Sequence, residues 1–123
     1  MKKYFLAIIL GLFYFEGIVA QSPGELKEQG FRAYENGSFN RASVFLEEAL
    51  QAGSTDDTVI FLLAEAKRQI YDCKTALNYY QQLIETEKDK YPQAVFYSGL
   101  MYKFQRQYEK ASEQFLEYSF LDD

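Results

Sequence analysis

A period of 34 to 35 residues runs through most of this 123-residue chain. Small residues recur at that spacing in two independent series: Gly30, Ala64 and Gly99, and Ala42, Ala76 and Ala111. A repeat of this length is a supersecondary unit that cannot bury its apolar face alone, so neighbouring units must stack on one another. The chain is long enough for one folded domain with a single core. We therefore expect one domain that is built as a stack of three units.

Larger side chains repeat with the same period. Four residues after each alanine of the second series stand Leu46, Tyr80 and Phe115. Apolar residues within a unit also recur at intervals of three and four, as in Ala42, Phe45, Leu46, Ala49 and Leu50. That spacing is typical of an amphipathic helix. Each unit is thus predicted to be a pair of helices, which gives six helices, no strand and an all-α fold.

Residues that favour helix ends stand where the first unit needs them. Ser22 and Pro23 offer a hydroxyl cap and a first-turn proline, so a helix is expected to begin near Pro23. After it, Gly37 tolerates a positive φ and Ser38 can cap the following helix. The first unit is therefore predicted to be a tight helical hairpin.

The other two units have comparable boundaries. In the second, we expect Asp56 to cap a helix that ends at Gln69, and a second helix to follow from Cys73 to about residue 88. In the third, Pro92 opens a helix that runs to about residue 105, and its partner covers 108–120. The predicted repeats span about 23–56, 57–90 and 92–123.

The first twenty residues have the pattern of an export leader. Lys2 and Lys3 give a positive start, and the run from Tyr4 to Phe15 is apolar and uncharged. Such a run suits a signal peptide and is short for a bilayer span, and Ala20 offers a small residue for cleavage. We expect a signal peptide at 1–20 and an exported domain at 21–123, in the periplasm or cell envelope and without a membrane span. An uncleaved membrane anchor is the alternative.

The charge of the chain argues against nucleic acid as a partner. The formal net charge is −5, and removal of a leader with Lys2, Lys3 and Glu16 would leave −6. The remaining basic residues are scattered, and only Lys67 and Arg68 are adjacent. A mildly acidic domain without a basic stripe is poorly suited to follow a phosphate backbone. We therefore expect no nucleic-acid binding.

The sequence offers little for catalysis. It contains no histidine, which removes the usual general base and the commonest transition-metal ligand. Cys73 is the single cysteine and is expected to be a small apolar core residue. Adjacent carboxylates such as Glu47 and Glu48 point to different sides of a helix, and no phosphate-binding or calcium loop occurs. We expect no enzyme activity, no cofactor and no metal.

The repeated residues resemble the tetratricopeptide repeat (TPR). In the first unit the pattern is carried by Gly30, Ala42, Leu46 and Ala49, and in the third by Gly99, Tyr102, Tyr108, Ala111 and Phe115. The second unit departs from it at Lys67 and Leu83, where an aromatic and a small residue are usual. The resemblance covers about residues 23–120. It implies a right-handed solenoid of three helical hairpins.

The same resemblance implies a binding groove, because the first helix of each hairpin lines the concave surface of such a solenoid. The groove residues would be Phe31, Tyr34, Phe61, Glu65, Arg68, Phe96, Leu100, Lys103 and Phe104. Their aromatic rings would supply contact area, and Arg68 and Lys103 would pair with acidic groups of a peptide. An aromatic stripe at helical spacing is also the ordinary pattern of a core, so packing between helices is the alternative.

The chain is similar in outline to the amino-terminal part of envelope proteins of the Bacteroidota, in which such repeats precede an OmpA-like domain. We therefore expect a non-catalytic scaffold that binds a peptide or protein partner in the groove. The clamp that holds chaperone tails is not supported, because only Lys27 fits it, and its other places carry Phe31, Leu62, Gln93 and Tyr97.

The end of the stack raises an alternative. A repeat stack normally closes with a polar capping helix, whereas here the third hairpin ends in Phe120 and Leu121. The last apolar face would be covered by further sequence, by a partner or by self-association. The chain would then be a self-associating or spacer segment of a longer envelope protein, with a homo-oligomer formed through the third repeat.

Overall fold

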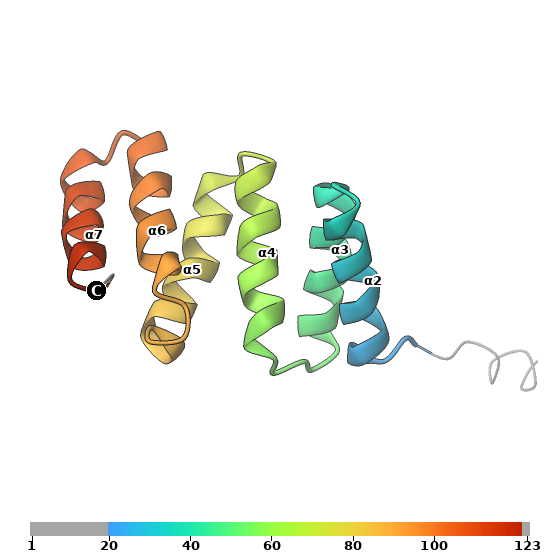
Figure 1. Cartoon of the computed structure of the whole chain (residues 1–123). Helices are drawn as coiled ribbons and strands as arrows, with labels where there is room; N and C mark the ends of the chain where they lie inside the picture. The colour runs from blue at the N-terminus through green and yellow to red at the C-terminus, as the bar shows by residue number, and fades with distance from the viewer. Residues whose placement is uncertain (1–19, 122–123) are drawn as a thin grey trace, which may run out of the picture.

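The computed structural model describes residues 20–121, and this part of the chain is a row of antiparallel helices without a strand (Figure 1). The helices are α2 (Pro23–Glu35), α3 (Phe39–Gln51), α4 (Asp57–Gln69), α5 (Cys73–Glu87), α6 (Gln93–Phe104) and α7 (Tyr108–Leu121). They form three hairpins, α2–α3, α4–α5 and α6–α7, and each hairpin packs against the next. The predicted all-α solenoid of three helical hairpins is confirmed.

The six helices begin and end within a residue or two of the predicted positions. The predicted leader lies outside the described residues, apart from Ala20, and stays a prediction together with the repeat boundaries. Within the part that the structure describes, no helix is both long and apolar enough to span a bilayer.

Each hairpin turns through a residue with positive φ. These residues are Gly37 (76°), Tyr71 (62°) and Arg106 (62°), which keep the repeat spacing. Only the first is glycine, the residue that adopts this conformation without steric cost. Tyr71 and Arg106 are exposed and adopt the same turn, even though residues with a side chain disfavour a positive φ. The hairpin geometry therefore does not depend on glycine.

The helix caps follow the sequence prediction with one exception. The Ser22 Oγ accepts a hydrogen bond from the Glu25 amide at 3.2 Å, and Asp56 accepts one from the Thr58 amide at 3.0 Å. The predicted cap by Ser38 is wrong, because its side chain makes no capping bond. Asp72 has almost the same backbone angles and still reaches the Thr75 amide at 3.4 Å, since its side chain is one atom longer.

The two helices of a hairpin approach most closely at the small residues of the first series. A methyl group added at Gly30 would lie 2.6 Å from the Leu46 side chain, and one added at Gly99 would lie 2.5 Å from Phe115. In the central hairpin, Ala64 and Tyr80 are fully buried in one core cluster. The large side chain of the second helix thus fills the space that the small residue leaves, and residues 20–121 supply the core themselves.

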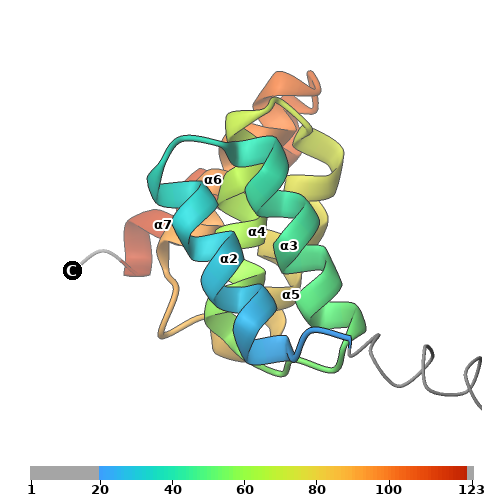
Figure 2. The same cartoon turned by 90° about the vertical axis from the view of Figure 1, so that its right-hand side faces the viewer.

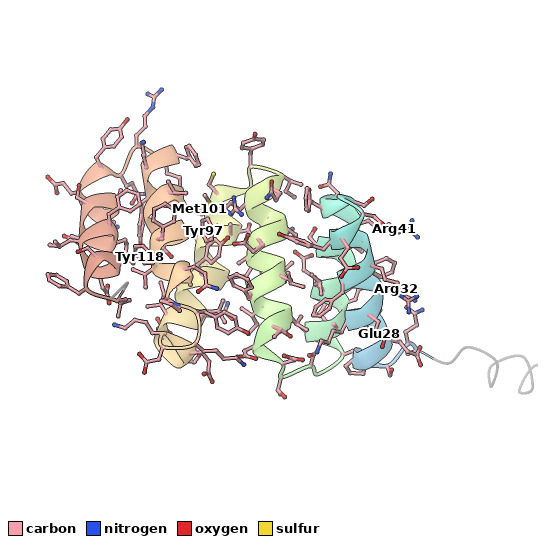
Figure 3. The ribbon with its side chains drawn as sticks, in the orientation of Figure 1. Glu28, Arg32, Arg41, Tyr97, Met101 and Tyr118 are labelled. Atoms are coloured by element: carbon pink, nitrogen blue, oxygen red, sulfur yellow. The ribbon has the colours of Figure 1, made fainter. Side chains whose placement is uncertain are left out.

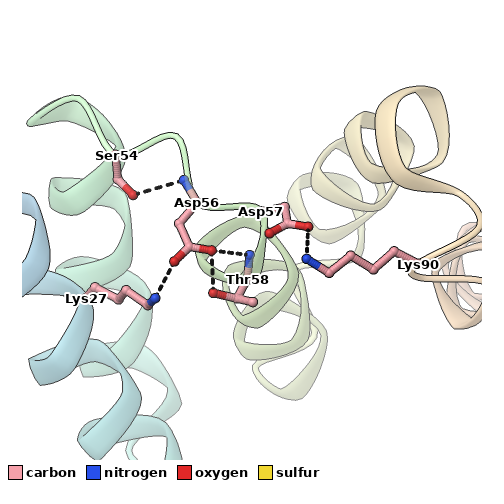
Figure 4. Close-up of polar contacts among 6 residues, drawn as sticks. All are labelled: Lys27, Ser54, Asp56, Asp57, Thr58 and Lys90. Carbon is pink, nitrogen blue, oxygen red and sulfur yellow. Dashed lines mark hydrogen bonds and ion pairs between the residues drawn. The ribbon is translucent and has the colours of Figure 1, made fainter.

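Charged residues reinforce the joints between hairpins. Lys27 on α2 pairs with Asp56 at the start of α4, and Lys90 lies 2.7 Å from Asp57 (Figure 4). The pKa of Asp56 is lowered to about 2, because Lys27 and Thr58 donate hydrogen bonds to its carboxylate. This carboxylate therefore stays charged throughout the neutral and mildly acidic range.

Replacing Gly99 with alanine is expected to lower the free energy of unfolding by about 1–2 kcal/mol, because overpacking against Phe115 outweighs the gain in helix propensity. Gly24→Ala is the matched control, since the nearest side-chain atom there lies 4.0 Å away. Urea unfolding followed by circular dichroism measures both. Equal stability of the Gly99→Ala variant and the native chain would contradict the close approach.

The Asp56 ion pair predicts a pH dependence. A carboxyl group whose pKa is lower in the folded state stabilises the fold above its unfolded pKa of 3.8 and loses that contribution as the pH falls towards about 2. Because the Lys27–Asp56 pair is about one-third exposed, we expect it to contribute about 1 kcal/mol to the free energy of unfolding. Asp56→Asn is expected to flatten this part of the curve of unfolding free energy against pH. An unchanged slope in the variant would contradict the assignment.

Candidate functional site

The first helices of the hairpins share one side of the stack. Seen along the row in Figure 2, α2, α4 and α6 lie to one side of α3 and α5. Polar and aromatic side chains from these three helices, together with Tyr80 from α5, lie around Arg68 in the last turn of α4. The structure therefore offers a site at the middle of the stack, which we call the Arg68 cluster: Tyr34, Glu65, Arg68, Tyr80 and Tyr97.

Glu65 and Arg68 form the centre of this cluster. Arg68 Nη2 donates to Glu65 Oε2 at 2.5 Å, and the Tyr80 hydroxyl donates to Glu65 Oε1 at 2.5 Å. Arg68 Nε in turn donates to the Tyr80 oxygen at 3.2 Å. Glu65 is only 6% exposed, so these bonds satisfy a buried carboxylate. The closed arrangement holds the guanidinium in one orientation.

An aromatic ring on α6 contacts the same guanidinium. The Arg68 Cζ lies 4.2 Å from the centre of the Tyr97 ring, a distance at which a cation and an aromatic face attract each other. Tyr97 is also stacked on Tyr80, with 5.7 Å between the ring centres. Arg68 thus joins α4, α5 and α6, and its orientation is set by two neighbouring hairpins.

The ionisation of the cluster follows from burial and the central ion pair. Burial and then the charge of Glu65 raise the pKa of Tyr80, so its hydroxyl keeps its proton. Burial alone lowers the pKa of Arg68, but the hydrogen bond and charge of Glu65 outweigh it and the net shift is upward. Burial, followed by the charge of Glu65, also raises the pKa of Tyr34 on α2. At ordinary pH Arg68 therefore keeps its charge, and Tyr34 and Tyr80 keep their protons.

Arg68 keeps part of its hydrogen-bonding capacity. Its side chain is 22% exposed, and its bonds within the described residues use Nε and Nη2. The Nη1 amino group makes no hydrogen bond to that part of the chain. A guanidinium that is fixed on one edge and open on another can donate hydrogen bonds to a carboxylate without a further loss of side-chain freedom.

The predicted groove residues fall into three environments. Glu65, Arg68 and Tyr34 lie in or beside the Arg68 cluster. Four others are half-buried and contact the core or neighbouring side chains: Phe31, Phe61, Phe96 and Leu100. Lys103 and Phe104 are exposed at the end of α6, Phe104 to 60%. Binding by any of these residues stays a prediction.

The half-buried rings make definite packing contacts. Phe61 is stacked on Tyr91 with ring centres 5.0 Å apart. Phe96 packs against Phe115 and Tyr118 of α7, at 5.6 and 5.4 Å, and Figure 3 shows Tyr118 at that end of the stack. These two rings hold hairpins and helices together, whatever else they contact.

Sequence reasoning missed Tyr80 and Tyr97 as members of the site. Tyr80 occupies the repeat position that Leu46 and Phe115 fill in the other hairpins, so the repeat pattern indicates only a core residue there. A hydroxyl at this buried position needs a polar partner, and Glu65 follows directly after the small residue Ala64 that Tyr80 covers. That pairing of a buried tyrosine with a nearby acid was the available signal.

Replacing Tyr80 with phenylalanine is expected to lower the free energy of unfolding by about 1–3 kcal/mol, because one oxygen of the buried Glu65 loses its donor. Tyr97→Phe is the matched control, since it keeps the ring beneath Arg68, and is expected to stay within about 0.5 kcal/mol of the native chain. Urea unfolding measures both variants. If Tyr80→Phe were as stable as Tyr97→Phe, the hydrogen bond to Glu65 would carry no stability.

No protein-family model and no curated protein matches the chain. Solved structures do match it. The TPR domain of Arabidopsis OM64 is 21% identical, with 82% of this chain and 83% of that chain covered and a TM-score of 0.71. The second TPR of Spaghetti (RPAP3), solved with an HSP90 peptide, is 20% identical, with 83% and 94% covered and a TM-score of 0.71.

PcrH, solved in complex with the chaperone binding region of PopB, is similar over 85% of this chain and 84% of its own. Its identity to the chain is 16% and the TM-score is 0.71. At these identities the likeness concerns the fold, and it agrees with the period, the hairpins and the close helix contacts described above. The chain has the tetratricopeptide-repeat fold.

Proposed function

We propose that this chain is a non-catalytic interaction module that binds a peptide or protein segment across the face formed by α2, α4 and α6. The observation that carries the proposal is the orientation of Arg68. Its guanidinium is held by Glu65, Tyr80 and Tyr97 and keeps one amino group available on this face. Ordering such a side chain before binding lowers the entropic cost of the complex.

The surroundings of Arg68 suit an extended or helical segment that carries an acidic group. Half-exposed rings of Phe31, Tyr34 and Tyr97 lie on the first helices, and Lys103 adds a second positive charge at the end of α6. Aromatic rings give large contact areas at low entropic cost, and Arg68 would bind a carboxylate through its free amino group. The partner is therefore expected to combine apolar and acidic residues.

Peptide binding is a property of similar folds. RPAP3 was solved with an HSP90 peptide and PcrH with a segment of PopB. The present chain would use other residues than a chaperone-tail clamp, because Lys27, the single residue that fits the clamp, is paired with Asp56. We therefore propose a protein partner of a different kind from a chaperone tail.

We further propose that the domain works in the periplasm or cell envelope, as a scaffold with an exported partner. The predicted leader at residues 1–20 and the resemblance to envelope proteins of the Bacteroidota support this location. The alternative role is a self-associating or spacer segment of a longer envelope protein. The exposure of Tyr108, Leu116 and Phe120 on α7 favours that alternative.

The binding proposal predicts that a variant of the face, Arg68→Lys with Lys103→Glu, retains its partner at least about tenfold less than the native chain. Lysine keeps a charge beside Glu65 but loses the planar fork, and the second change reverses a charge. Residues 21–123 would be immobilised and the envelope proteins that bind compared by quantitative mass spectrometry.

The matched control is Arg41→Lys with Lys74→Glu, which makes the same changes at exposed positions of α3 and α5. Circular dichroism confirms that all three proteins are helical. A partner that both variants retain equally well would overturn the proposal that this face binds it.

A further inference from the structure

The joints between hairpins repeat one contact. Glu47 Oε1 on α3 lies 2.8 Å from Lys67 Nζ on α4. At the next joint, Gln81 Nε2 on α5 donates to the Tyr102 hydroxyl on α6 at 2.6 Å. Gln81 follows Glu47 by 34 residues and Tyr102 follows Lys67 by 35, which is the period of the chain. The same two repeat positions therefore meet at both joints.

At each end of the stack, one of these two repeat positions has no equivalent partner position on a neighbouring hairpin. One period after Gln81 stands Leu116 on α7, which is 61% exposed. One period before Lys67 stands Ala33 on α2, which is 7% exposed and lines a cavity of about 320 Å³ between α2 and α3. Both positions are polar at the internal joints and apolar at the ends.

A third apolar residue, Phe45, lies in the same cavity as Ala33. Tyr79 on α5 packs against the core cluster that joins α3 to α4, which contains Leu46 and Leu63. Its equivalent in the first hairpin is Phe45, which lines the cavity beside Ala33. A leucine placed as Glu47 is placed would lie between Ala33 and Phe45. Leu116 would thus leave water and contact apolar surface on both sides.

A polar group in the cavity also lacks a partner. Gln29 Oε1 is buried and has no hydrogen bond within the described part of the chain, and Gln29 lines the same cavity. The equivalent of Gln29 at the first joint is Leu63, which shares a cluster with Ala49 of the preceding helix. The residue of α7 that corresponds to Ala49 is Tyr118, whose hydroxyl is a donor. The repeat positions thus place Tyr118, whose ring also packs on Phe96, opposite Gln29.

We propose that a second copy of this chain places the α7 end of its stack on the cavity between α2 and α3, which is distinct from the predicted binding groove, and continues the solenoid from one molecule into the next. Leu116 would enter the cavity at Ala33 and Phe45, and Tyr118 would meet Gln29. Figure 3 shows Tyr118 at one end of the stack and Arg32 and Arg41, which line the cavity, at the other.

This contact is heterologous, because it joins two different surfaces. Each copy that joins leaves one α7 end and one α2–α3 cavity free, so association continues beyond a dimer unless a ring closes. The face of α2, α4 and α6 is not used, and the proposal is therefore independent of partner binding there. A tail-to-tail dimer through α7 is the arrangement that the test must separate from it.

The test uses residues 21–123 and sedimentation velocity over a range of concentrations. The native chain is expected to grow beyond a dimer as its concentration rises. Leu116→Lys and Ala33→Glu are each expected to weaken association at least about tenfold, because the first brings a positive charge to a cavity lined by Arg32 and Arg41 and the second places a charge against Leu116. Mixing the two variants is expected to restore association, since the introduced lysine and the introduced glutamate would then form the Glu47–Lys67 pair with its charges exchanged.

Asn78→Lys is the control, because it adds the same charge as Leu116→Lys at an exposed position of α5. It is expected to associate like the native chain. A native chain that stays monomeric at its highest soluble concentration would overturn the proposal. So would a dimer that Leu116→Lys abolishes and mixing does not restore. Leu116 is exposed, so its variant folds even if Ala33→Glu does not, and association unaffected by Leu116→Lys would also refute the contact.

Discussion

The close approach of the two helices in each hairpin is the constraint on which the rest of the structure depends. Gly30 and Gly99 leave no room for a methyl group against Leu46 and Phe115. Because the helices are this close, the large residues Leu46 and Tyr80 of the first two hairpins are fully buried, and the next hairpin can pack on the pair of helices. Repeating this arrangement every 34 to 35 residues brings equivalent positions into register, which creates both the shared face of α2, α4 and α6 and the repeated joint contacts.

The sequence predicts the fold closely, because the period and the end-capping residues are local signals. It does not predict the side-chain contacts within the site. Glu65 and Arg68 were expected on one face, but their bonds to Tyr80 depend on how two helices are turned towards each other. Phe61 was expected in the groove and is stacked on Tyr91, which the repeat pattern does not specify. The missing Ser38 cap shows the same limit, since one atom of side-chain length separates it from Asp72.

The middle and the ends of the stack have different chemistry. In the middle, Glu65, Tyr80 and Tyr97 fix Arg68 and hold neighbouring hairpins together. At the α7 end, Leu116 and Phe120 are 61% and 73% exposed. At the other end, Gln29, Arg32 and Arg41 line a cavity. Partner binding on the shared face and association through the ends would therefore proceed without competing for the same residues.

Each hairpin packs against its neighbours, and the central one is covered on both sides. Native-state hydrogen exchange of residues 21–123 tests this most directly. We predict the slowest exchange in α4 and α5, with α7 exchanging faster in dilute solution and more slowly as concentration rises. Exchange in α7 that is as slow as in α5 at every concentration would contradict an open end and, with it, the stack described here.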